Sequence, residues 1–82
     1  MKSRTLLTIR LNQADNVVVA RAEIVAGVDI PGEAVSSKDS IPAGHKIATS
    51  DIAKEQVVRK YNQIIGFATV DITAGEHVHV HN

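Results

Sequence analysis

The sequence of 82 residues contains no cysteine and no tryptophan, and its large aromatic residues are Tyr61 and Phe67 alone. Without cysteine the chain has no disulfides, no zinc site built on thiolates and no cysteine nucleophile. Two aromatic rings do not make the stacking platform on which proteins bind single-stranded nucleic acid. Nine basic residues balance nine acidic ones, so the basic stripe that binds phosphate backbones is also missing. We therefore expect no nucleic-acid partner.

Long apolar segments are missing as well. No run approaches the roughly 18 apolar residues that span a bilayer, and the charged residues 1–7 are not followed by the apolar stretch of a signal peptide. We expect a cytoplasmic protein with no membrane partner. A hydrophobic fraction of 44% excludes a disordered chain, and the length predicts a single domain over residues 1–82.

A short repeat is the main pattern that is present. In it, isoleucine is followed three residues later by glycine, and an aliphatic residue comes soon after. Isoleucine ends an extended segment, Pro42 suits the first central position of a turn, and glycine allows the positive φ at which the chain reverses. The repeat predicts several small hairpins. Its copies are Ile24–Gly27, Ile41–Gly44, Ile72–Gly75 and an imperfect copy, Ile52–Glu55, which ends in glutamate instead of glycine.

Alternating and β-branched segments between these turns predict the strands. Residues 17–19 are all valine, as in a strand buried on both faces, and Asp15 and Asn16 most simply form the turn before it. The segment 51–65 is ambiguous, because its apolar spacing is typical of an amphipathic helix whereas the repeat predicts a turn and a strand. The predicted strands are Thr8–Leu11, Asn16–Ala20, Gly66–Val70 and His77–His81.

Histidines are concentrated at one end, with His77, His79 and His81 among the last six residues. Strict alternation with valine places them on one face of a strand, with neighbours ~6–7 Å apart. Two such imidazoles can converge on one metal ion, with a third ligand arriving from elsewhere; imidazole suits zinc, iron, manganese or nickel. Composition alone favours the simpler interpretation, a solvated strand face that tolerates histidine.

His45 and Lys46 follow Gly44 at a predicted turn. A histidine and a lysine on a loop can hold a carboxylate or act as acid and base. The local pattern by itself favours an ordinary exposed turn.

Two motifs occur in order, Pro-x-Gly-His-Lys at residues 42–46 and Ala-Gly-x-His-Val-His-x-His-Asn at residues 74–82. Together they resemble the small domain of the altronate/galactarate dehydratase family. The resemblance runs from about Asn12 to Asn82 and implies an SAF domain with an all-β, β-clip fold of short strands and tight hairpins with at most one or two helical turns. Residues 51–54 are then expected to form a turn and residues 56–60 a strand. The other matching segments are Asp15–Ala20, Asp51–Ala53, Lys60–Tyr61 and Ile65–Gly66.

The sequence departs from the family pattern at its turns. Asn62 stands where the pattern has glycine after Lys-Tyr, and asparagine tolerates the positive φ needed there. Glu55 stands where the repeat expects glycine, so we expect that hairpin to be one residue short. The stretch before Pro42 is also shorter than the pattern expects.

The resemblance implies a sugar-acid dehydratase that removes water from a hexonate or hexarate, such as D-altronate or galactarate, and gives a 2-keto-3-deoxy acid. It implies a large catalytic subunit or domain as partner, because a chain this short is too small for base, metal site and substrate pocket together. A divalent metal, iron or manganese, would be shared with or held by that larger chain. The candidate catalytic residues are His45 and Lys46, near the substrate carboxylate. The candidate metal ligands are His77, His79 and His81, which can also lie at the interface between the two subunits.

Two alternatives stay open. The small subunit of sulfolactate sulfo-lyase resembles this sequence too, and would eliminate sulfite instead of water after the same proton abstraction. SAF domains also occur as non-catalytic binding or assembly modules, in which case the histidines are structural or lie at an interface.

Overall fold

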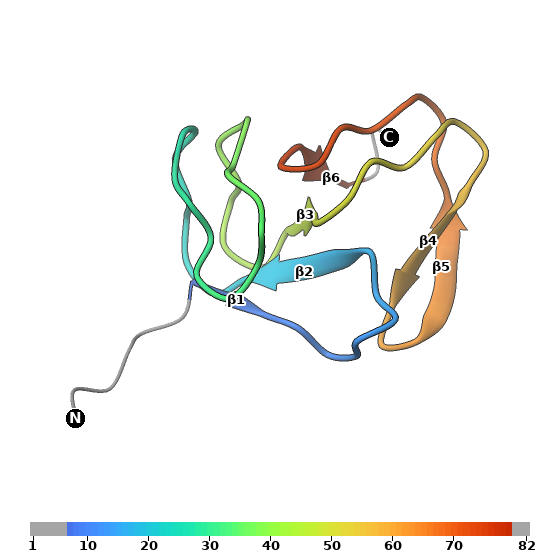
Figure 1. The fold of residues 1–82 in the computed structure, drawn as a ribbon, viewed down its shortest axis with the longest axis horizontal. Coiled ribbons are helices and arrows are strands. Elements are labelled where there is room, and N and C mark those ends of the chain that lie inside the picture. The colour runs from blue at the N-terminus through green and yellow to red at the C-terminus, as the bar shows by residue number, and fades with distance from the viewer. Residues whose placement is uncertain (1–6, 80–82) are drawn as a thin grey trace.

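The computed structural model describes residues 7–79, and these form short strands and turns without a helix. The strands β1, β2, β3 and β6 make an antiparallel sheet in the order β1-β2-β3-β6, and β4 pairs with β5 as a separate hairpin (Figure 1). None of the described residues belongs to a helix that could cross a membrane. The all-β prediction is confirmed. The strand bounds are β1 Thr8–Ile9, β2 Val17–Ala20, β3 Lys46–Ala48, β4 Val57–Lys60, β5 Gln63–Phe67 and β6 His77–Val78.

The ambiguous segment 51–65 is a turn followed by strands, as the resemblance implied. Residues 54 and 55 form the turn, β4 begins at Val57, and a two-residue turn at Tyr61 and Asn62 leads into β5. The apolar spacing does not mark one buried face, because Val58 is buried whereas Ile64 and Ile65 are exposed.

The repeat pairs its isoleucines two by two. Ile24 bridges Ile41 and Ile52 bridges Ile72, each pair through two reciprocal backbone hydrogen bonds of 2.7–2.9 Å. All four side chains are at most 2% exposed. The first pair joins the two green loops that stand side by side in Figure 1. The repeated isoleucine is therefore the residue through which neighbouring hairpins are both paired and buried.

The fourth residue of each copy reverses the chain at positive φ. Gly27, Gly44 and Gly75 have φ values of 88°, 82° and 93°, and Glu55 has a φ of 72°. The Gln56 N–H donates to the Ala53 carbonyl (2.9 Å), as the residue after glycine does in the Ile41 and Ile72 copies. The prediction of a hairpin one residue short is therefore wrong, because Glu55 itself takes up the conformation of the glycine.

Pro42 lies one position earlier in its turn than predicted. Its carbonyl accepts the His45 N–H (3.0 Å), so Ala43 and Gly44 are the two central residues. Positive φ at the second central residue is what a type II turn requires, and glycine supplies it without strain.

Two hydrophobic clusters lie on opposite faces of the β2–β3 pair. The cross-strand partners Val17 and Ala48 belong to one cluster, and the partners Val18 and Ile47 belong to the other. Burial of β2 on both faces was predicted and is confirmed. The first cluster also contains Val58 from β4, so it joins the hairpin to the four-stranded sheet.

Strand positions away from the repeat are less well predicted. The strand expected at Gly66–Val70 is wrong in position, because β5 spans Gln63–Phe67 and residues 69–70 form a bend. β5 is largely exposed, so no apolar alternation marks it, and a bulge shifts its register between Val58 and Arg59. β1 and β6 are shorter than expected, and residues 80–81 lie outside the described residues.

Asp15 and Asn16 bind the β4–β5 hairpin to β2. The Asp15 carboxylate accepts the backbone N–H groups of Tyr61 (2.7 Å) and Asn62 (2.6 Å). The Asn16 side chain accepts the Arg59 N–H (2.7 Å) and donates to the Val57 carbonyl (3.0 Å). These four bonds place the hairpin beside β3 and β6.

Candidate metal centre

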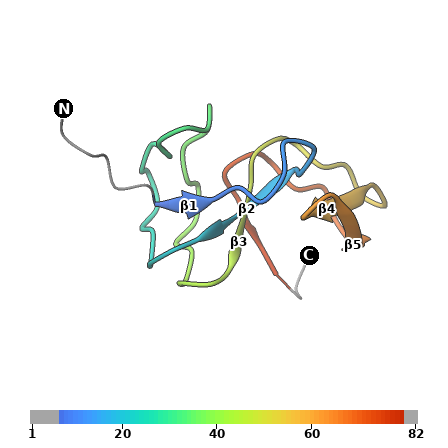
Figure 2. The same ribbon diagram turned by 90° about the horizontal axis from the view of Figure 1, so that it is seen from below.

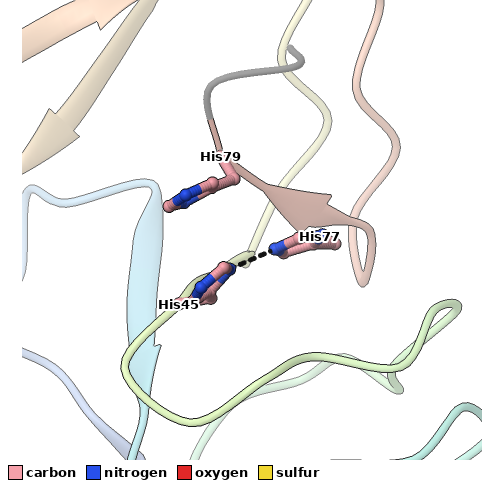
Figure 3. A group of neighbouring side chains, drawn as sticks. All are labelled: His45, His77 and His79. Atoms are coloured by element: carbon pink, nitrogen blue, oxygen red, sulfur yellow. Dashed lines mark hydrogen bonds between the residues drawn. The ribbon is translucent and has the colours of Figure 1, made fainter.

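His45, His77 and His79 come together because of the way β3 pairs with β6. The register matches Lys46 with Val78 and Ile47 with His77, so one step further His45 lies across from His79. Residues directly opposite each other in an antiparallel pair point to the same face, and His77 shares that face with His79 because they are two residues apart. The three imidazoles therefore face one another from two neighbouring segments (Figure 3).

The three rings are close and nearly parallel. The centroid of the His45 ring is 3.9 Å from that of His79 and 5.0 Å from that of His77, and the His77 and His79 centroids are 5.8 Å apart. The His45 Nδ1 and His77 Nε2 atoms are hydrogen-bonded at 2.8 Å. One nitrogen of this pair must accept, so the two rings cannot both carry a proton there.

His45 reaches the cluster because of the proline three residues before it. In two other copies of the repeat the residue after the turn caps it: the carbonyl oxygen of the Gln56 side chain and a carboxylate oxygen of Glu76 each accept a turn N–H, at 2.9 and 2.6 Å. His45 holds the same place in its copy, but Pro42 has no N–H to offer. The imidazole points toward β6 instead of back to its own turn.

Backbone hydrogen bonds hold the segments that carry the rings. The His45 carbonyl accepts the Ala20 N–H (2.8 Å), and the His77 N–H donates to a carboxylate oxygen of Asp39 (3.0 Å). All three imidazoles are half-buried. The cluster is thus positioned by the sheet before any ligand arrives.

Lys46 occupies the other face of β3. Successive residues of a strand alternate in direction, so Lys46 points away from His45 and lines a pocket that also includes His79. Burial lowers the pKa of Lys46 below its ordinary value, and the nearby charge of Lys60 lowers it further. A partly desolvated ammonium is a strong partner for an anion.

The three-histidine cluster has the donor set and spacing of a metal site. One nitrogen from each ring lies within 4.8 Å of the other two. Two nitrogens bound to one ion at about 2.1 Å in a tetrahedral arrangement are about 3.4 Å apart, so ring rotations that move the nitrogens by up to about an ångström would bring all three within range. Imidazole nitrogens suit divalent iron, manganese, zinc and nickel. The residues therefore fit a divalent cation.

The structure brings some of the predicted site residues together and leaves others apart. His77 and His79 lie together as the alternation predicted, and the third imidazole of the cluster belongs to His45, which the sequence had paired with Lys46. His81 lies outside the described residues and stays a prediction. Two neighbours were missed, Asp39 behind His77 and Lys60 near Lys46. No local motif marks either one, because both contacts depend on long-range pairing.

Comparison with known proteins decides the family. The sequence profile of the SAF domain of altronate/galactarate dehydratase matches residues 6–82. The chain belongs to this family. The resemblance in its two histidine-containing motifs is thereby confirmed.

This SAF domain is similar to parts of larger enzymes. It is 43% identical to altronate dehydratase of Escherichia coli and 41% identical to that of Bacillus subtilis, over 76 residues in each case. These matches cover 90% of the SAF domain but 15% of either relative. It is also 53% identical over 45 residues to the (2R)-sulfolactate sulfo-lyase subunit alpha of Chromohalobacter salexigens, which covers 55% of the SAF domain and 48% of that subunit.

Proposed function

We propose that this SAF domain supplies a three-histidine site for a divalent metal, iron or manganese, to a sugar-acid dehydratase whose active site is completed by a larger catalytic chain or domain. The observation that carries the proposal is the convergence of His45, His77 and His79, with one nitrogen of each within 4.8 Å of the others. The similarity to two altronate dehydratases supports the reaction class. The substrate would be a hexonate or hexarate, which loses water to give a 2-keto-3-deoxy acid.

In this proposal the histidines bind the metal ion and Lys46 binds the substrate. His45, His77 and His79 would hold the cation, which when bound would stabilise the negative charge formed on removing a proton beside a carboxylate. Lys46 would hold the substrate carboxylate, since its half-buried, partly desolvated ammonium is a strong partner for an anion.

The larger chain is required for physical reasons. The chain spans about 15% of the length of the altronate dehydratases it matches, and the pocket that includes His79 is lined mostly by apolar side chains, which offer few partners to the hydroxyls of a six-carbon sugar acid. A cytoplasmic location belongs to the same proposal.

Metal content and turnover of the assembled enzyme test the proposal together. We expect His77→Gln and His79→Gln to lower metal affinity by at least the roughly tenfold to hundredfold that loss of an outer-shell partner costs and to reduce dehydration, with the assembly intact by light scattering. His45→Gln should behave in the same way. Loss of assembly with normal metal content would point to the non-catalytic alternative, in which the histidines are structural.

A sulfo-lyase is the second candidate function. The 53% identity to a (2R)-sulfolactate sulfo-lyase subunit alpha favours it, although over a shorter segment. Both reactions begin with removal of a proton beside a carboxylate, so the same cluster serves either. Assays of the assembled enzyme with altronate, galactarate and sulfolactate separate the two by the product released, a keto acid with water or with sulfite.

A further inference from the structure

A pocket of about 220 Å³ lies beside the three-histidine cluster. Gly66 lies on its wall and pairs with Val58 across the β4–β5 hairpin. A Cβ atom built on Gly66 meets nothing within 4 Å, so the missing side chain leaves this space open. The remaining wall is mostly apolar and consists of Val58, Ile65, Phe67 and Val78, together with Lys46 and His79.

The shape and lining of this pocket do not suit a whole sugar acid. A polyol buried against aliphatic and aromatic groups would leave most of its hydroxyls without hydrogen-bond partners. The volume is also below the roughly 300–1,000 Å³ of pockets that enclose small molecules. A single large apolar side chain, with only its tip near Lys46 and His79, matches both properties.

The hairpin that forms the wall presents further apolar surface. Tyr61, Ile64, Ile65 and Phe67 are between 48% and 67% exposed. The segment 57–67 carries Arg59 and Lys60 but no acidic residue. Exposed large apolar side chains close in sequence to charged ones are typical of protein interfaces, and the positive charge predicts acidic residues on the partner.

The partner we infer is the remainder of such an enzyme, that is, its larger chain or domain. The chain matches 15% of its altronate dehydratase relatives, so most of such an enzyme lies outside it. His79 belongs both to the cluster and to the pocket. A chain seated on this surface would therefore lie next to the cluster at His79.

We infer that the pocket and the exposed face of β4–β5 form the docking surface for the larger catalytic chain or domain, which inserts one apolar side chain at Gly66 and places acidic residues near Arg59 and Lys60. The inference rests on the proposed function only for the identity of the partner. It concerns assembly and does not depend on metal binding or on turnover.

Amide hydrogen exchange on the assembled enzyme tests this inference, with Gly66→Val as the main variant. The Cβ atom of valine meets no other atom within 4 Å and valine favours strand structure, so its intrinsic effect would be to slow exchange in β5. We expect the opposite: exchange at residues 63–67 about tenfold faster than in the unaltered enzyme, and unchanged exchange at residues 17–20. Phe67→Ser should act in the same direction.

Val25→Ser is the matched control. Val25 is 59% exposed and belongs to the segment 21–30, which lies at the end of the molecule away from β4–β5 (Figures 1 and 2), so this variant should leave exchange at residues 63–67 unchanged. Equal exchange in the Gly66→Val and unaltered enzymes would overturn the inference. A light-scattering mass that loses one copy of this chain in Gly66→Val, with the larger chain still bound, would overturn it in favour of self-association. Normal assembly without metal would refute the proposed function alone.

Discussion

Gly75 is the residue whose identity the fold restricts most sharply. Its φ is 93°, in the region that L-residues with a side chain avoid. A Cβ atom there would also lie 2.1 Å from the backbone carbonyl oxygen of Ser36, and the Lys38 N–H donates to the Gly75 carbonyl at 2.8 Å. The close approach of residues 36–38 to the turn before β6 therefore depends on the absence of a side chain.

Gly75→Ala should lower the free energy of unfolding by about 2 kcal/mol or more, because it adds a backbone clash to the cost of positive φ. Gly44→Ala is the control, since Gly44 has a φ of 82° but no atom within 4 Å of an added Cβ. It should cost about 1 kcal/mol from strain alone. Urea unfolding of both variants measures the difference, and equal costs would show that the Ser36 contact carries no energy.

The site residues were only partly predictable from the sequence. Strict alternation was enough to place His77 and His79 on one face, because the period of a strand is two. It could not show that His45 joins them, since this depends on the register of β3 with β6 and on a proline that leaves His45 without a turn N–H to accept. Lys46 points away from His45 because successive side chains alternate in direction along β3.

At the level of elements, the β4–β5 hairpin is held in place by residues far from it in the sequence. Its turn residues Tyr61 and Asn62 have φ values of 58° and 56°, as a two-residue type I′ hairpin requires. Asparagine accommodates this conformation, but tyrosine does so at a cost. The buried carboxylate of Asp15 offsets the cost by accepting both N–H groups of the turn.

Asp15→Ala should loosen this hairpin and destabilise the fold by about 2–4 kcal/mol, because it removes two hydrogen bonds to a charged acceptor and leaves both donors unpaired. Thermal or urea unfolding gives the size of the effect, and hydrogen exchange at residues 57–67 locates it. Asp71→Ala is the control, since the exposed carboxylate of Asp71 accepts one N–H, that of Lys54, at 2.8 Å. It should cost below about 1 kcal/mol, and similar costs for the two variants would refute the special role of Asp15.

Glu55→Gly should stabilise the protein by about 0.5–1 kcal/mol. Glutamate at a φ of 72° bears a left-handed strain of about 1–2 kcal/mol, which exceeds the entropy cost of a glycine in the unfolded chain. Lys54→Gly, one position earlier in the same turn, is the control and should not stabilise, because positive φ is not required there. A lower melting temperature for Glu55→Gly would contradict the assignment of Glu55 to the glycine position of the repeat.

Elements inside the repeat were predicted better than those outside it. Isoleucine marks each turn because its position is buried, and glycine marks it because its position needs positive φ. β5 has no such mark, since most of its side chains are exposed and a bulge interrupts its register. Asp15 and Asn16 were interpreted as a local turn because sequence proximity cannot show that their side chains bind a hairpin more than 40 residues away.

At the scale of the whole molecule, the three-histidine cluster lies beside the meeting point of the two sheets. One hydrophobic cluster includes Val17 from β2, Val58 from β4 and Val78 from β6, and the pocket opens beside Val58 and Val78. The histidines are therefore carried by the four-stranded sheet, whereas the wall next to them is carried by the hairpin. The proposed ligands and the proposed docking surface therefore lie next to each other in this chain, which covers 15% of the length of an altronate dehydratase relative.

Pulsed electron paramagnetic resonance of the assembled enzyme loaded with Mn²⁺ tests the central claim most directly, because it detects nitrogen nuclei bonded to the metal. We expect couplings from imidazole nitrogens in the unaltered enzyme, and weaker nitrogen couplings in His45→Gln with the assembly unchanged. Substitution of His45 is the most informative, since that residue enters the site only through the β3–β6 register. Mn²⁺ that shows no nitrogen coupling, or couplings unaffected by His45→Gln, would contradict the three-histidine site.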